Sequence, residues 1–178
     1  MATYIGFLRA INLGATRKFP KASIVTAVEA AGFTDVATYI NTGNVRFDTG
    51  LRSRARIEAA LETAFEAEAG FAVPTIVFTQ QELREIAEHA ASFGHGGRHY
   101  VSLLKQAPSE AAIRRLEDSS TTEEVAKVGG RAVHLMLGAN YHEARLTNAA
   151  VEKHLGVATN RNVTVIRALA EKWCDRRS

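Results

Sequence analysis

The sequence has one cysteine, three prolines and no long apolar run. A lone Cys174 excludes an internal disulfide framework and a cysteine-rich zinc site, and it has no activating base near it in the sequence. No stretch approaches the roughly 20 apolar residues that a membrane helix needs. The N-terminus enters a strand-like run without a basic, then apolar, leader. We therefore expect a cytoplasmic protein with no membrane partner.

An excess of charge of one sign is also lacking. Lys and Arg number 22 against 19 Asp and Glu, so the formal net charge is +3, which does not by itself predict binding to nucleic acid. Hydrophobic residues make up 46% and charged residues 23%, as in ordinary globular proteins. At 178 residues the chain fits one large domain or two small ones.

The stretch 38–47 predicts a β-hairpin, because two β-prone runs flank Thr42-Gly43. A two-residue loop would pair Thr38 with Phe47 and Ile40 with Val45. Ile40, Val45 and Phe47 would then face a core. Tyr39, Asn41, Asn44 and Arg46 would share the opposite face, which is either solvated or used for binding.

Around this hairpin, the first half reads as strand, helix, strand, strand, helix, strand. The nearly continuous apolar run 4–11 predicts a central strand, and Pro20 and Gly32 bracket the first helix. A second helix from about Arg52 to Gly70 precedes a strand over 72–78. This order matches the ferredoxin-like unit, an antiparallel sheet with both helices on one face.

The second half repeats the order of elements. Thr79 and Glu82 form a capping box for a connecting helix, and the Gly-rich stretch 92–98 is the best candidate for a boundary or a mobile loop. Beyond it we expect a strand from His99, a helix, a hairpin turning at Gly129-Gly130, a short helix capped by Thr147 and a last helix capped by Thr159. The prediction is an α+β fold of two packed ferredoxin-like (βαββα-type) subdomains, 1–80 and 99–178, joined by 81–98.

Three motifs carry a resemblance to a known family. They are Leu8-Arg9-Ala10-Ile11-Asn12-Leu13-Gly14 running on to Lys18-Phe19-Pro20, then the hairpin 39–47, then Thr159-Asn160-Arg161-Asn162. Together they resemble domain-of-unknown-function family 1697, uncharacterised bacterial proteins of about this length. The family pattern has Gly where Ala10 stands. The resemblance implies a fold of two ferredoxin-like subdomains, and it implies no activity.

The polar residues of these motifs are candidates for an anion site. Arg9 interrupts an apolar strand, where a buried charge needs a partner or a ligand. A predicted helix start at 161–162 offers free N–H groups, which favour anions. If the three segments meet, they form a site for phosphate, a nucleotide or a nucleic-acid end, built from Arg9, Asn12, Lys18, Asn41, Asn44, Arg161 and Asn162. Alternatively, each residue serves only the fold.

Other chemistries have weaker support. Tyr39 beside Arg46 could stack on RNA, but the aromatic signature of sheet-faced RNA-binding modules is absent. His95 and His99 lack a third ligand, His142-Glu143 lacks a second histidine at metalloprotease spacing, and each histidine is expected to be exposed. We expect no cofactor and no metal. The best hypothesis is a small binding module. An enzyme acting on a phosphorylated or carboxylated molecule and a protein-interaction domain stay open as alternatives.

Overall fold

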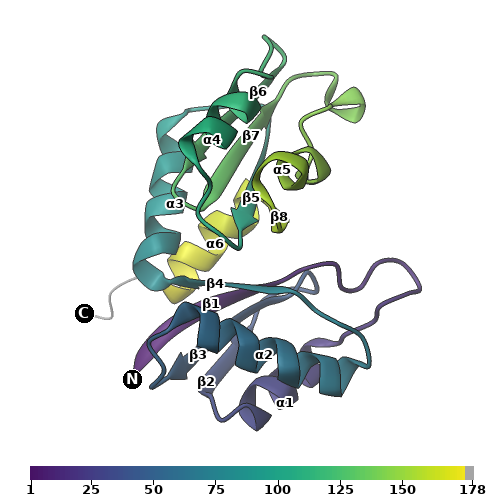
Figure 1. Cartoon of the computed structure of the whole chain (residues 1–178), viewed down its shortest axis with the longest axis vertical. Coiled ribbons are helices and arrows are strands. Elements are labelled where there is room, and N and C mark those ends of the chain that lie inside the picture. The colour runs from purple at the N-terminus through teal and green to yellow at the C-terminus, as the bar shows by residue number, and fades with distance from the viewer. Residues whose placement is uncertain (175–178) are drawn as a thin grey trace. The chain divides into compact units, whose positions relative to one another are not determined.

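The computed structural model describes residues 1–174 and divides the chain into two compact units, unit 1 (Met1–Glu82) and unit 2 (Leu83–Ser178). Each unit contains a four-stranded antiparallel sheet with helices packed on it (Figure 1). The chain is therefore a mixed α/β protein with two such sheets. In unit 1 the elements are β1 (Ala2–Leu8), α1 (Lys21–Ala30), β2 (Thr34–Thr38), β3 (Asn44–Thr49), α2 (Arg54–Ala69) and β4 (Thr75–Thr79).

The core of unit 1 lies between one face of its sheet and the two helices. The strands are ordered β2-β3-β1-β4, so β1 is central and pairs with β3 and β4. Alternate residues of the strands face α1 and α2, which contribute Ile24, Val28, Ile57, Leu61 and Phe65 to one buried cluster. Burial of these large side chains supplies the main driving force for this unit.

The hairpin differs from the two-residue turn that the sequence predicts. Thr38 pairs with Val45 instead of Phe47, and residues 39–43 form the connection. Ile40 has a φ of 51° and is 37% exposed, so its predicted core position is wrong, whereas Val45 and Phe47 are buried as expected. The longer loop arises because the Asn44 side chain bonds back to the Tyr39 carbonyl instead of facing Asn41.

Unit 2 repeats the strand order of unit 1. Its sheet runs β6-β7-β5-β8, the same order when the strands are counted from the start of the unit. The elements are α3 (Gln80–Ser92, beginning in unit 1), β5 (Arg98–Leu104), α4 (Glu110–Glu117), β6 (Glu124–Gly129), β7 (Ala132–Leu137), η1 (Tyr141–Glu143), α5 (Asn148–Leu155), β8 (Ala158–Asn162) and α6 (Val163–Trp173). Helices α4 and α5 cover one face with an apolar core, and α6 contacts β5 and β8.

The end of the chain corrects one sequence expectation. Thr147 caps α5 and Gly156 ends it, as predicted. Thr159, however, lies within β8, and Asn162 caps the last helix by accepting a hydrogen bond from the backbone N–H of Thr164 at 2.9 Å. The helical spacing of apolar residues thus located α6 correctly. It gave no indication of the five-residue strand β8 that lies directly before the helix.

Candidate functional site

The loop between β1 and α1 has an unusual backbone. Ala10, Asn12 and Arg17 all have φ between 52° and 59°, a left-handed conformation that costs a non-glycine residue energy. Within the loop the N–H of Asn12 donates to the Arg17 carbonyl at 2.7 Å, and Leu13 bridges Thr16. Such strain persists only where surrounding contacts hold it in place, and it concentrates at functional sites. We call residues 9–19 the cation loop.

Asn12 holds the cation loop against the hairpin connection. Its Nδ2 donates to the carbonyl oxygens of Asn41 at 2.7 Å and Phe19 at 3.2 Å, while its Oδ1 accepts from the N–H of Phe19 at 2.8 Å. The structure therefore brings Asn12 and Asn41 together, as the anion hypothesis requires. It does so through the backbone of Asn41, and the Asn12 amide is used for positioning.

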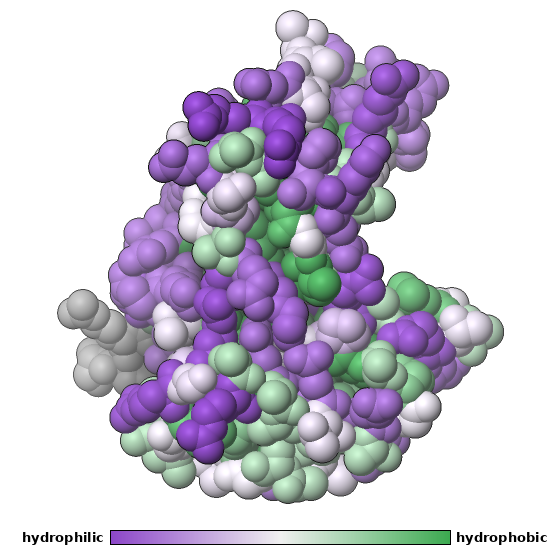
Figure 2. Space-filling view, viewed as in Figure 1, coloured by the Kyte–Doolittle hydropathy of each residue, from purple (hydrophilic) through white to green (hydrophobic). Residues whose placement is uncertain are grey.

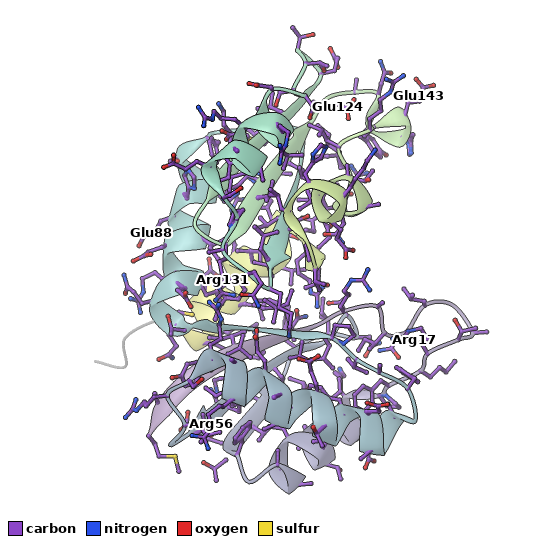
Figure 3. All side chains as sticks on the ribbon, viewed as in Figure 1. Arg17, Arg56, Glu88, Glu124, Arg131 and Glu143 are labelled. Atoms are coloured by element: carbon purple, nitrogen blue, oxygen red, sulfur yellow. The ribbon has the colours of Figure 1, made fainter. Side chains whose placement is uncertain are left out.

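Arg17 is a functional candidate that the sequence reasoning missed. Its Nε donates to the Ala10 carbonyl at 2.6 Å, one terminal nitrogen donates to the Ala72 carbonyl at 2.8 Å, and its guanidinium stacks 4.4 Å from the centre of the Phe71 ring. Figure 3 shows it on the loop, at the opposite end of unit 1 from Arg56. Its position between Thr16 and Lys18 did not identify it as a candidate from the sequence, because its contacts with Phe71 and Ala72 come from a distant segment.

The cation loop and the start of α1 carry positive charge with no carboxylate of their own. Arg9, Arg17, Lys18 and Lys21 are basic, and the first acidic residue of the chain is Glu29. Lys18 and Lys21 are exposed, whereas Arg9 is half-buried. This local concentration of charge, rather than the net charge of +3, is what would attract an anion.

Gly43, the last residue of the hairpin connection, and Asn44, the first residue of β3, serve the turn. Asn44 is 1% exposed, and its Nδ2 donates to the Tyr39 carbonyl and to the Thr42 hydroxyl, both at 2.9 Å. Gly43, at φ 87°, accepts a hydrogen bond from the N–H of Leu8 at 2.9 Å. The buried Asn44 amide closes the hairpin connection beside β1. Any contact with a ligand would therefore be made by neighbouring residues.

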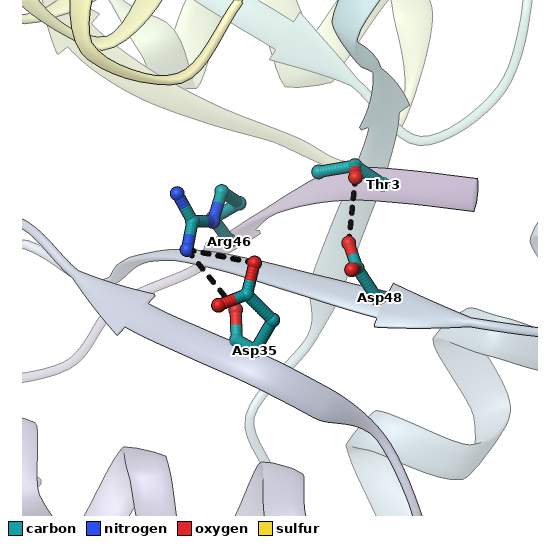
Figure 4. A network of polar contacts seen from close by, with 4 residues as sticks. All are labelled: Thr3, Asp35, Arg46 and Asp48. Atoms are coloured by element: carbon teal, nitrogen blue, oxygen red, sulfur yellow. Dashed lines mark hydrogen bonds and ion pairs between the residues drawn. The ribbon is translucent and has the colours of Figure 1, made fainter. Parts of the chain in front are cut away.

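Arg46, on the polar face of the hairpin, forms an ion pair. Arg46 lies 3.1 Å from the Asp35 carboxylate and also donates to the Asp35 carbonyl, while the Thr3 hydroxyl donates to Asp48 at 2.6 Å (Figure 4). These contacts span three strands and fix their register. They give Arg46 a structural partner in place of the stacked base considered from the sequence.

Arg161 and Asn162 belong to unit 2, so each is described there. Arg161 lies in β8 instead of at a helix start, is 5% exposed, and donates to the Thr159 hydroxyl and the Asn160 carbonyl, both at 2.8 Å. Burial lowers the pKa of its guanidinium to about 10. Asn162 caps α6. Both side chains thus have structural roles within unit 2.

Histidines gather on the other face of the unit 2 sheet, and the burial of His99 there corrects the expectation that it is exposed. His99 and His134 are 3% and 0% exposed, and their rings share a hydrogen bond of 3.0 Å between Nε2 and Nδ1. The rings of His89 and Phe93 pack on His134. Burial, then the neighbouring histidines, lower the pKa of His134 to about 3. Burial, then His95, Arg167 and His89, lower that of His99 to about 4.

This histidine cluster does not form a metal centre. Within residues 1–174, no group of three or more His, Cys, Asp or Glu side chains could hold a metal ion. In the same part of the chain, every helix is too short or too polar to cross a membrane. The alternation of His99 with Val101 and Leu103 along a predicted strand was the sequence signal that could have placed His99 in the interior.

Comparison with known proteins identifies the family of the chain and a protein with a similar fold. The model of the family described as a protein of unknown function (DUF1697) matches residues 1–134. The chain belongs to the DUF1697 family. Its structure is similar to that of the conserved bacterial protein SP0830 from Streptococcus pneumoniae, with a TM-score of 0.76 and 20% sequence identity over 96% of this chain and 97% of that one. A search of curated proteins found no match.

The DUF1697 match separates the candidate residues into two groups. The matched residues include the cation loop, the hairpin connection and the histidines at 89, 95, 99 and 134. Arg161 and Asn162 lie beyond the match. At 20% identity the similarity to SP0830 shows a shared fold and carries no information about ligands.

Proposed function

We propose that this DUF1697 protein is a small binding module whose unit 1 holds an anionic ligand at the cation loop. The observation that carries the proposal is a strained loop rich in basic residues and without acidic ones, fixed in one conformation by Asn12 and Arg17. A pre-ordered site binds without the entropic cost of ordering a loop. The ligand class is phosphate, a nucleotide or the phosphate end of a nucleic acid.

Within this proposal the residues divide by task. The charge comes from Arg9 and Lys18, and Asn41 offers an exposed side-chain amide beside the loop. Asn12 and Asn44 are positioning residues, because hydrogen bonds to backbone carbonyls use their amides. Arg161 and Asn162 have structural tasks in unit 2, and the proposal assigns the anion to unit 1 alone.

We also infer that both units are ferredoxin-like. The support is the element order β-α-β-β-α-β in unit 1 and the same spatial order of strands in the two sheets. In each unit the first strand lies at the centre of the sheet, and in unit 1 the cation loop follows it directly. A loop that leaves a central, fully paired strand begins from a rigid base, which suits a binding residue such as Arg9.

A thermal-shift titration with inorganic phosphate, pyrophosphate, ATP and a 5′-phosphorylated RNA tests the anion site. A ligand that binds only the folded protein raises the unfolding midpoint, and the rise grows with the ratio of ligand concentration to dissociation constant. We expect a rise with at least one of these probes. We expect Lys18→Glu and Arg9→Ala to abolish it, because each removes charge from the loop.

Arg56→Ala is the matched control for the loss of one positive charge. Arg56 is exposed on α2, at the far end of unit 1 from the loop (Figure 3), so this variant should keep the full shift. Chloride at equal ionic strength controls for screening. If no probe shifts the wild-type midpoint beyond chloride, or if Lys18→Glu keeps the shift, the anion site does not exist.

A further inference from the structure

A cavity of about 280 Å³ lies within unit 2, on the face of the sheet that α5 covers. Leu135, Leu137, Ala144 and Leu146 give it apolar walls, Tyr100 and Tyr141 add aromatic rings, and Thr147, Asn148 and Asn160 add polar groups. Mostly apolar walls with a few fixed polar groups are the usual character of a small-molecule site. The volume is at the small end for such sites, so the ligand would be a single small ring system.

The polar wall of the cavity has a defined orientation. The Nδ2 of Asn148 donates to Glu152 Oε1 at 3.1 Å and to the Ala158 carbonyl at 3.0 Å, which turns its Oδ1 toward Ser102. The Ser102 hydroxyl therefore donates to Asn148, at 2.9 Å, and must accept from the Nδ2 of Asn160, at 3.2 Å. This chain of bonds fixes which end of the Asn160 amide is the donor.

The Asn160 amide retains hydrogen-bonding capacity. One Nδ2 hydrogen is used on Ser102, while the second hydrogen and the Oδ1 have no partner in the part of the chain that the structure describes. Asn160 is half-buried and lines the cavity. A free donor and a free acceptor on one amide can bind an adjacent acceptor and donor on one edge of a planar heterocycle.

The opposite wall is held in place by charged groups. Glu124 of β6 accepts from the backbone N–H groups of Arg145 and Leu146, at 2.6 and 2.8 Å, and Figure 3 shows it beside this segment. The Arg98 guanidinium stacks 4.3 Å from the centre of the Tyr141 ring and donates to its hydroxyl at 3.0 Å. These contacts fix the segment 141–147 over the sheet, so this wall of the cavity is pre-ordered.

We propose that this cavity binds a planar nitrogen heterocycle the size of a single nucleobase. Asn160 would pair with its hydrogen-bonding edge, and the leucines and tyrosines would cover its faces. Aromatic contact with a flat ring and an amide reading one edge together select such a ligand over an aliphatic molecule of equal size. The site lies in unit 2, so it is separate from the proposed anion site in unit 1.

Two-dimensional 1H–15N NMR titration of the full chain with adenine and cytosine tests the proposal. We expect shift changes in the side-chain amide signals of Asn160 and Asn148 and in the backbone signals of Tyr100, Leu137 and Tyr141. Benzyl alcohol, which has a ring but no adjacent donor and acceptor, should bind much more weakly. Asn160→Ala should weaken binding of the preferred heterocycle roughly tenfold, because two hydrogen bonds are lost.

Ala144→Phe and Ala149→Phe form a matched pair of variants. Ala144 lines the cavity, whereas Ala149 is exposed on α5 and is not part of its lining. Filling the cavity at 144 should abolish the shift changes, and the same substitution at 149 should preserve them. Absence of shift changes with both heterocycles at millimolar concentration, shift changes confined to other residues, or full binding by Ala144→Phe would overturn the proposal.

Discussion

Single residues decide whether the proposed anion site keeps its shape. Left-handed residues occur in both connections that meet at Asn12, namely Ala10, Asn12 and Arg17 in the cation loop and Ile40 and Gly43 in the hairpin. The φ of 59° at Ala10 is one that glycine adopts readily and that an alanine side chain disfavours. The backbone of the two loops is therefore set by tertiary contacts that outweigh local preference.

Gly43 is the residue where this constraint is most severe. A Cβ at this position would lie 2.7 Å from the Cβ of Leu8 and 3.0 Å from the Cδ1 of Ile11, at a φ of 87°. We predict that Gly43→Ala lowers the free energy of unfolding by at least about 2 kcal/mol, because backbone strain and a clash with a buried strand add together. Chemical denaturation measured by circular dichroism checks this.

Gly50 supplies the control for Gly43. It lies just after β3 in the same unit, has open space around its Cα and does not need a left-handed backbone. Gly50→Ala should change the stability by no more than about 0.5 kcal/mol. Equal effects of the two substitutions would mean that the hairpin connection tolerates a side chain at position 43, which would contradict the predicted constraint.

At the scale of elements, the start of α6 shows how a candidate ligand residue can serve the fold. The Oδ1 of Asn162 accepts from both the N–H and the hydroxyl of Thr164, each at 2.9 Å. We predict that Asn162→Ala lowers the free energy of unfolding by about 1 kcal/mol, the usual effect of losing an N-cap. Asn162→Asp should keep most of the stability, because a carboxylate caps equally well.

This pair of variants also separates the two hypotheses for Asn162. A residue that binds an anion would lose affinity with Asp, because a second negative charge repels the ligand, whereas a cap would be preserved. Denaturation curves and the phosphate titration, measured on the same two proteins, distinguish these results. Loss of stability in Asn162→Asp as large as in Asn162→Ala would contradict the capping role.

The sequence predicted the order of elements better than their ends and contacts. Periodic apolar residues located the helices, and alternation located Val45 and Phe47 in the core, because both signals are local. The strand β8 was missed, since Thr159 and Asn160 resemble the entry to a helix and only pairing with β5 makes them a strand. The partners of Asn12, Arg17 and His134 were not predictable, because they come from distant segments.

At the scale of the whole molecule, the histidine cluster should make stability depend on pH. In the unfolded chain, His99 and His134 take up protons near the ordinary histidine pKa of 6.5. In the folded protein, burial lowers the pKa of His99 to about 4 and that of His134 to about 3. Between these values the unfolded chain binds more protons than the folded one. The part of the stability that depends on these two neutral histidines is therefore fully present above pH 6.5, and it is lost as the pH falls toward 3.

Replacement of one histidine tests this prediction. Between pH 7 and pH 5, each of the two groups can remove up to about 2 kcal/mol of stability. His134→Gln cannot take up a proton, so the loss of stability over this range should be smaller in the variant than in the wild type. His142→Gln is the control, because His142 is exposed and is not part of the buried pair of His99 and His134.

Urea denaturation at pH 7, 6 and 5 measures these differences, and a variant that is less stable at every pH remains informative because only the change with pH is compared. A decline as steep in His134→Gln as in the wild type would assign the acid sensitivity to other groups. In the expected case the acid-sensitive unit is unit 2, since both histidines lie in its sheet, on β5 and β7. Unit 1 (1–82) contains no histidine, so this loss of stability would not arise at the cation loop.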